Sequence, residues 1–221
     1  MHLNSELLFR KYALIYFQSN LKILEIGPAG FPSAYQKIVN NDNITWHTAD
    51  FSNTSYIENA ASHLTYQINS PYKFPINDES YDVIISGQVI EHVGQVWKWI
   101  DELVRITRPK GKIITINPVS WPYHEAPIDC WRIFPDGITA LAEMKGLTVN
   151  KCLFESLEID DILKYDSKST FIPGRSYNYE NSLKDLKKRI YFNKIIRHVP
   201  FLKSLEQPIE VSFDTISILE K

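Results

Sequence analysis

The chain has 221 residues, of which 44% are hydrophobic and 23% charged, so it has enough apolar residues for a core and is not a disordered chain. A formal net charge of −2 argues against attraction of the whole surface to nucleic acid. No stretch approaches the about 18 apolar residues of a membrane span, and polar and charged residues near the N-terminus interrupt the apolar run that a secretory signal needs. Two cysteines (Cys130, Cys152) are too few for a disulfide framework. We therefore expect one cytoplasmic domain over residues 1–221.

Residues 3–18 have the pattern of an amphipathic helix, with Leu3, Leu7 and Leu14 on one side. As an N-terminal cap over residues 1–20, this helix either packs on the edge of a sheet or closes over a pocket.

The stretch from Leu21 to Gly30 predicts a buried strand followed by a turn bracketed by glycines. Gly27 and Gly30 lack a Cβ and let the backbone approach a ligand, while Glu25 can accept hydrogen bonds from a cationic or hydroxylated group. A glycine pair alone fits an ordinary strand-to-helix turn equally well.

A helix is predicted from Ser33 to Asn40 and a second strand from Ile44 to Ala49, which ends at Asp50. Asp50 follows Gly30 by twenty residues, where a nucleotide-binding βαβ unit presents a carboxylate to ribose hydroxyls. The alternative for Asp50 is a cap or turn residue, but together with the glycine turn the pattern favours a ligand-binding role.

Further strands are expected around Tyr66–Ile68 and over Tyr81–Ser86, with residues 54–64 forming a helix or loop. From Gln88 onward apolar residues recur at helical spacing, and Ile113–Ile116 predicts the next strand. This alternation of strands and helices indicates a parallel sheet with right-handed crossovers.

The last third of the chain predicts a helix ended by Gly146, a strand over Leu147–Phe154 and a final antiparallel strand over Ile209–Leu219. Between the last two strands, residues 156–208 form an insertion that is longer than a hairpin needs. Its 182–203 portion holds seven basic residues against one acid, Asp185. These residues form either a solvated helix face or a patch for an anionic partner or membrane surface.

Five motifs occur in the order typical of class I S-adenosylmethionine-dependent methyltransferases, and the series resembles the type 11 group most. They are the Glu25–Gly30 turn, Asp50, the run from Phe74 to Ser86, the Val89–Val93 stretch with its Glu91-His92 pair, and Arg108–Gly111. The resemblance covers about residues 20 to 150.

This resemblance implies an α/β, Rossmann-like fold: a seven-stranded, mostly parallel sheet with helices on both faces and a C-terminal antiparallel strand. It also implies S-adenosyl-L-methionine as the cofactor, with its methionine part at the glycine turn, its ribose at Asp50 and its adenine near Ile68 or Asn69. The implied cofactor-binding residues are Glu25, Gly27, Gly30, Asp50, Phe51, Ile68, Asn69, Ser86, Gly87 and Gln88.

The segment from Asn117 to Gly137 follows a strand end and is the part of the chain densest in aromatic, proline and titratable residues. Its run from His124 to Gly137 is similar to one found in type 11-like enzymes of glycan and natural-product pathways, which implies an acceptor-binding loop. A hydroxyl acceptor must lose a proton, and histidine has the ordinary pKa suited to take it near neutrality.

We expect His124 to be the catalytic base and Asp129 to orient it or act alone. Tyr123, Trp131, Arg132 and His92 are expected to line the acceptor side, with Trp121 as part of an apolar wall. The alternative is structural: an ion pair of Asp129 with Arg132, and tryptophans in the core. We expect no metal site, because His2, His47, His63 and His198 have no partners at ligand spacing.

The predicted function is methylation of a small molecule or sugar, most readily on oxygen. A nitrogen or carboxylate acceptor in natural-product or peptide tailoring is the alternative reaction. The alternative of another class is a non-catalytic subunit that keeps the cofactor fold. Nucleic acid is not an expected substrate, and the oligomeric state is not predicted.

Overall fold

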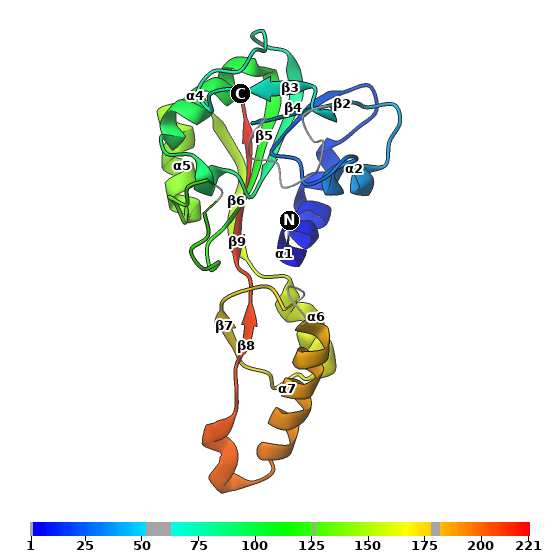
Figure 1. Cartoon of the computed structure of the whole chain (residues 1–221), viewed down its shortest axis with the longest axis vertical. Coiled ribbons are helices and arrows are strands. Elements are labelled where there is room, and N and C mark those ends of the chain that lie inside the picture. The colour runs from blue at the N-terminus through cyan, green and yellow to red at the C-terminus, as the bar shows by residue number, and fades with distance from the viewer. Residues whose placement is uncertain (1, 52–62, 126, 178–181) are drawn as a thin grey trace.

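The computed structural model describes residues 2–51, 63–125, 127–177 and 182–221. Its main sheet has seven strands in the order β3-β2-β1-β4-β5-β9-β6, and β9 runs antiparallel to both of its neighbours. The strands are β1 (Lys22–Ile26), β2 (Thr45–Phe51), β3 (Tyr66–Ile68), β4 (Tyr81–Gly87), β5 (Thr107–Pro118), β6 (Thr148–Glu155) and β9 (Asp214–Glu220). Helices lie on both faces, so the predicted α/β, mostly parallel fold is confirmed (Figure 1).

The register of the parallel strands brings their carboxyl ends to one edge of the sheet. Ile26 at the end of β1 pairs with Ala49 of β2 on one side and with Ser86 of β4 on the other. The residues that follow these positions, Gly27, Asp50 and Gly87, therefore emerge together.

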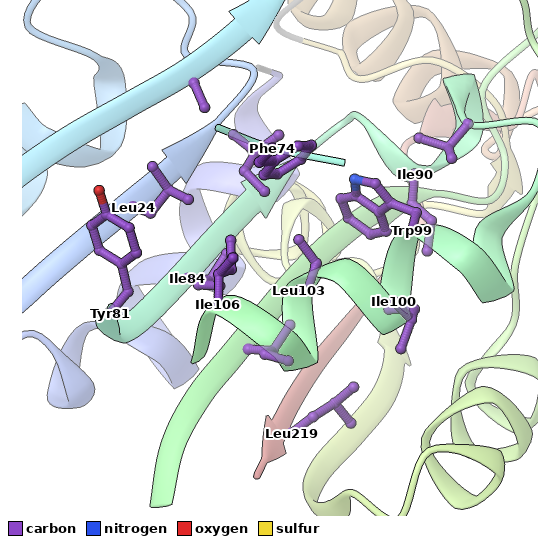
Figure 2. Close-up of a cluster of buried hydrophobic side chains, with 14 of the residues drawn as sticks. Leu24, Phe74, Tyr81, Ile84, Ile90, Trp99, Ile100, Leu103, Ile106 and Leu219 are labelled. Carbon is purple, nitrogen blue, oxygen red and sulfur yellow. The ribbon is translucent and has the colours of Figure 1, made fainter. Parts of the chain in front are cut away.

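One face of the sheet is covered by α4 (Val96–Ile106) and α5 (Pro135–Met144). Figure 2 shows Trp99, Ile100, Leu103 and Ile106 of α4 packed with strand residues such as Leu24. The helix expected from Gln88 begins only at Val96, after a short 3₁₀ turn, η3 (Ile90–His92). Gln88 has a positive φ of 59°, which ends the strand in a conformation that an α-helix cannot continue.

The opposite face is covered by α2 (Ala34–Val39) and the N-terminal pieces α1 (Leu3–Leu8), η1 (Phe9–Ala13) and η2 (Leu14–Tyr16). The predicted amphipathic helix over residues 3–18 is thus broken by a π-helical and a 3₁₀ stretch. The π turn shifts which side faces the sheet, so the buried residues are Leu8, Phe9, Ala13 and Phe17 rather than Leu3, Leu7 and Leu14.

Between β6 and β9 the chain forms α6 (Glu158–Tyr165), β7 (Phe171–Pro173), α7 (Ser182–Ile196), η4 (Pro200–Leu205) and β8 (Ile209–Val211). The single strand predicted over Ile209–Leu219 is wrong, since β8 pairs with β7 in a separate two-stranded sheet and β9 starts at Asp214. Figure 1 shows these elements extending away from the main sheet. Within the described ranges, none of the helices combines the length and apolar character needed to cross a bilayer.

Most of the predicted helix or loop over residues 54–64 lies outside the described residues.

Candidate active site

A cavity of about 870 Å³ opens at the carboxyl ends of β1, β2 and β4. Its wall comes from the turn after β1, the ends of β2 and β3, the β4–α4 connection, the loop after β5 and the N-terminal residue His2. Ligand pockets in proteins generally fall in the range of about 300–1,000 Å³, so this cavity has the size of a large ligand pocket.

Glu25 lies at the inner end of this cavity and is almost completely buried. Its Oε2 accepts hydrogen bonds from Ser33 Oγ and from Trp46 Nε1, the latter at 2.9 Å. These partners fix the carboxyl group and leave Oε1 to face a ligand. Burial raises the pKa of Glu25 to about 7, against the effect of the two hydrogen bonds.

Two glycines in the cavity wall allow close packing that no other residue permits. Gly27 has φ +68°, and a Cβ there would come within 2.5 Å of Val89 Cγ2. A Cβ on Gly87 would meet the hydroxyl oxygen of Tyr35 at 2.1 Å. Glycine at these two positions therefore lets Val89 and Tyr35 pack directly against the ends of β1 and β4, and both glycines line the cavity.

The remaining predicted cofactor residues divide into two groups. Asp50, Phe51, Ile68 and Gly30 line the cavity together with Glu25 and Gly27. By contrast, Asn69 is exposed and outside the wall, and Ser86 is buried beneath it.

Gln88 lines the cavity, but its side chain is occupied by the N-terminal cap. Its Nε2 donates to Ser5 Oγ at 2.8 Å and to Asp214 Oδ1 at 3.3 Å. The amide therefore ties the end of β4 to α1 and β9.

The loop after β5 brings His124, Trp121, Pro127 and Ile128 to the cavity, opposite the β4–α4 connection that carries His92. His124 Nδ1 lies 3.1 Å from the Pro122 carbonyl oxygen and 3.4 Å from Asp129 Oδ2. A proton on Nδ1 donates to this pair of oxygens, which leaves Nε2 as the acceptor nitrogen of the neutral ring.

Asp129 and Arg132 form a bidentate ion pair, with N–O distances of 2.5 and 2.7 Å. Arg132 also donates to the carbonyl oxygens of Trp121 and Pro122, so it holds the loop and does not line the cavity. Burial opposes ionisation of Asp129, but bonds from Arg132 and the His124 backbone keep its pKa below the ordinary value. With both oxygens engaged, Asp129 orients the loop and is not available to act alone.

Tyr123 and Trp131 lie outside the cavity wall. The Tyr123 side chain is 70% exposed and donates to Glu125 Oε1. Trp131 packs against the core and donates from Nε1 to the Val93 carbonyl at 2.8 Å.

Glu91, His92 and His124 form a titratable cluster at the acceptor side. The His92 and His124 rings meet edge to face at 4.9 Å, and His92 Nε2 is 3.7 Å from Glu91 Oε1. Glu91 is fully buried with no hydrogen bond to either carboxyl oxygen, and burial raises its pKa to about 8. His92 donates from Nδ1 to the Ile128 carbonyl at 2.5 Å, and burial lowers its pKa.

Sequence reasoning missed several residues of the wall. His2 reaches the cavity, stacks on Trp121 at 4.8 Å and lies 3.2 Å from the buried Asp214. Tyr35, Tyr72 and Trp99 also line it. No motif marks these residues, because helix packing and the N-terminal cap bring them in from elsewhere in the chain.

The site fits the cofactor that the sequence implies. Two carboxyl groups, Glu25 and Asp50, stand at neighbouring strand ends, and the backbone at Gly27 is bare between them. Carboxylates are acceptors for an amino group and for ribose hydroxyls, and a glycine turn admits the chain that joins the two.

Comparison with known proteins agrees with this geometry. A family model described as a methyltransferase domain matches residues 24–115. A ubiquinone biosynthesis O-methyltransferase of Rickettsia akari is 34% identical over 172 residues, which cover 65% of this chain and 68% of that protein.

Two solved structures share the fold at low sequence identity. A SAM dependent methyltransferase from Archaeoglobus fulgidus matches with a TM-score of 0.59 and 12% identity, over 98% of this chain and 92% of that one. A putative sarcosine dimethylglycine methyltransferase from Galdieria sulphuraria matches with a TM-score of 0.56 and 16% identity, over 98% and 84%. With the motifs, the sheet order and the relative from Rickettsia in agreement, the chain belongs to the class I S-adenosylmethionine-dependent methyltransferases of the type 11 kind.

Proposed function

We propose that this enzyme methylates a hydroxyl group of a small molecule or sugar and that His124 takes the proton from that hydroxyl. The observation that carries the proposal is the His124 imidazole at the cavity wall, whose Nδ1 lies 3.1 Å from the Pro122 carbonyl oxygen and 3.4 Å from Asp129 Oδ2, so that Nε2 would be the nitrogen that accepts the proton. The relative from Rickettsia akari, which is named an O-methyltransferase, supports oxygen as the methylated atom.

The charges of the cavity favour a neutral acceptor. Among the described residues, the wall contains no lysine or arginine, and Arg132 is bound to Asp129 instead. An anionic carboxylate acceptor would enter this wall without a cation to balance it. A hydroxyl group enters at lower cost and needs a base only when it reacts.

Each group of the chain has a defined task in this scheme. When bound, S-adenosylmethionine supplies the methyl group as an electrophile on sulfur. Glu25 and Asp50 would hold its amino group and ribose, while Trp121 and Ile128 shape an apolar acceptor wall. His124 accepts the hydroxyl proton at Nε2 as the oxygen becomes nucleophilic, and Asp129 keeps the ring in the required orientation.

The experiment measures formation of S-adenosylhomocysteine with phenols, sugars, amines and carboxylates as acceptors. Turnover with hydroxyl acceptors is expected, and His124→Ala should lower kcat by about a hundredfold or more at neutral pH while cofactor affinity is kept. His198→Ala, which removes an exposed histidine at the end of α7, is the matched control and should keep full activity. Full turnover in His124→Ala would show that the base lies elsewhere.

The same activity assay, repeated after dialysis against a chelator, distinguishes proton transfer by histidine from catalysis by a metal ion. The ligand atoms of Glu91, His92 and His124 lie within 4.8 Å of one another, whereas two ligands of one tetrahedral ion are separated by about 3.4 Å. We expect dialysis against a chelator to leave the rate unchanged. A loss restored by zinc would assign these residues to a metal ion and remove the base role from His124.

The alternatives remain outcomes of the same assay. Turnover restricted to amines or carboxylates would support tailoring of nitrogen or carboxylate acceptors. Cofactor binding without turnover on any class would support a non-catalytic binding subunit. We infer a cytoplasmic location, which suits the free thiols of Cys130 and Cys152.

A further inference from the structure

The elements between β6 and β9, residues 158–211, form a part of the molecule that we call the C-terminal module. It has its own two-stranded sheet and its own buried cluster, made of Ile162, Leu186, Ile190, Ile209 and Val211. Figure 1 shows α7 and η4 at the end of the molecule far from the main sheet. The outer surface of the module therefore contributes nothing to the catalytic cavity.

That outer surface exposes large apolar side chains. Tyr191 is 68% exposed, Ile195 48% and Phe192 41%, although the opposite side of α7 is buried in the module. The chain continues into η4 with Phe201, which is 81% exposed, and Leu205, which is 55% exposed. Such a concentration of exposed apolar groups on two consecutive elements is typical of a surface that contacts a partner.

The same surface carries a local excess of positive charge. Residues 182–203 hold seven basic residues against one acid, a net of +6, and because the whole chain carries −2, the remaining residues carry −8. Arg197 is neutralised by Asp166 and Glu206. Among the described residues of this segment, the exposed lysines Lys184, Lys187 and Lys203 have neither an ion-pair partner nor a side-chain hydrogen bond. Their charges are thus free to interact with an external anion.

A groove of about 470 Å³ lies between α6 and α7 on this module. Ile162, Leu186 and Ile190 contribute to its wall from the apolar cluster, and three lysines also line it (Lys164, Lys187, Lys194). Lys164 pairs with Asp161, and Lys194 donates to the Tyr165 carbonyl, so Lys187 is the unpaired cation of the rim among the residues described. A lipid phosphate with the start of its acyl chain matches this combination of an apolar interior and a cationic rim.

We propose that the C-terminal module binds the surface of a bilayer that contains anionic lipids. Phe192, Ile195, Phe201 and Leu205 would enter the boundary between headgroups and acyl chains, and the unpaired lysines would contact lipid phosphates. Charge complementarity favours an anionic surface. Nucleic acid would also attract the lysines, but it offers no apolar phase for the aliphatic side chains of Ile195 and Leu205.

The test is sedimentation of the full chain with vesicles of phosphatidylcholine alone or mixed with phosphatidylglycerol. The protein is expected to sediment with the mixed vesicles and not with the neutral ones. The triple variant Lys184→Glu/Lys187→Glu/Lys203→Glu should lower the partition coefficient at least about tenfold, because each lysine near an anionic surface contributes about a fivefold factor.

The matched control reverses three exposed lysines outside the module, Lys37, Lys98 and Lys110, and so has the same net charge. Its partition coefficient should stay within about twofold of that of the unchanged chain, because these lysines lie away from the proposed membrane-binding surface and only lysines close to the bilayer contribute. Phe201→Ser tests the apolar contribution separately and should also weaken binding. Circular dichroism melts verify that all variants are folded.

Equal sedimentation with both vesicle types, no sedimentation, or equal losses in the two triple variants would overturn the proposal. Binding to a DNA duplex without binding to vesicles would also overturn it and assign the surface to nucleic acid. The measurement requires no methyl transfer, so its result is independent of the proposed acceptor and base.

Discussion

Glu25 is a carboxyl group that the fold buries almost completely at the inner end of the cavity, hydrogen-bonded to Ser33 and Trp46. Burial raises its pKa to about 7, so the folded protein holds this proton more tightly than the unfolded chain does. The resulting contribution to stability is fully present below the ordinary carboxyl pKa of about 4.3 and is lost as the pH rises to about 7.

Glu25→Gln should therefore stabilise the protein at pH 8 relative to the unchanged chain, by up to about 3 kcal/mol, and have little effect at pH 5. Urea unfolding at the two pH values measures the difference. The control is Glu143→Gln, which changes an exposed carboxyl group on α5 and should shift neither value. An equal effect of Glu25→Gln at both pH values would refute the buried, proton-binding state of Glu25.

The place of a single residue in the site could be predicted where a sequence motif determines it. It could not be predicted where tertiary packing determines it. The order of motifs placed Glu25, Gly27 and Asp50 at strand ends, and all three line the cavity. The sequence around Trp131 did not show whether this side chain lies in the core or in the pocket. Its position depends on a hydrogen bond to the Val93 carbonyl, which lies far from it in the sequence. His2 was not predicted to line the cavity for the same reason, since its contact with Trp121 is not visible in sequence.

At the scale of elements, a buried asparagine makes several of the hydrogen bonds that join the N-terminal cap to the sheet. Asn4 is fully buried, and its Nδ2 donates to Asp214 Oδ2 at 2.7 Å and to the Glu155 carbonyl at 3.0 Å. Its Oδ1 accepts from the Leu157 amide at 2.8 Å. These three bonds join α1 to β9 and to the end of β6.

Asn4→Ala should destabilise the protein by about 3 kcal/mol, because it leaves the buried Asp214 carboxylate and a backbone amide with fewer partners. The midpoint of urea unfolding measures this loss. Asn150→Ala, which removes an exposed bond to Glu220, should change stability by no more than about 0.5 kcal/mol. Similar losses in the two variants would show that Asn4 is not a special anchor.

The positions of the strands were predictable because runs of apolar and β-branched residues are bounded by turn residues, although β5 extends beyond the predicted Ile113–Ile116 to Thr107–Pro118. Helix limits depended on local backbone geometry. The helix expected from Gln88 starts at Val96 because Gln88 adopts a positive φ. The last strand divides because Ser212 and Phe213 carry the chain from the sheet of the module into the main sheet. Apolar periodicity continues across both interruptions and therefore could not reveal them.

At the scale of the whole molecule, the cavity and the positive charge lie in different places. The cavity stands at the strand ends of the main sheet, and the basic residues lie on α7 and η4 of the C-terminal module. Composition alone could not show this separation, because the net charge of −2 is the sum of +6 in residues 182–203 and −8 in the rest of the chain. Substitutions in the cavity and on the C-terminal module should therefore change methyl transfer and the proposed bilayer binding independently.

The central claim is that the cofactor binds across the ends of β1 and β2. Calorimetric titration of S-adenosylhomocysteine into the unchanged chain and into Asp50→Ala tests it most directly, with the exposed Asp42→Ala as control. Because a carboxylate that bonds ribose hydroxyls contributes about 1.5–3 kcal/mol, Asp50→Ala should weaken binding by at least about tenfold, and Asp42→Ala should not change it. Equal affinity in all three proteins, or no binding to the unchanged chain, would contradict the account.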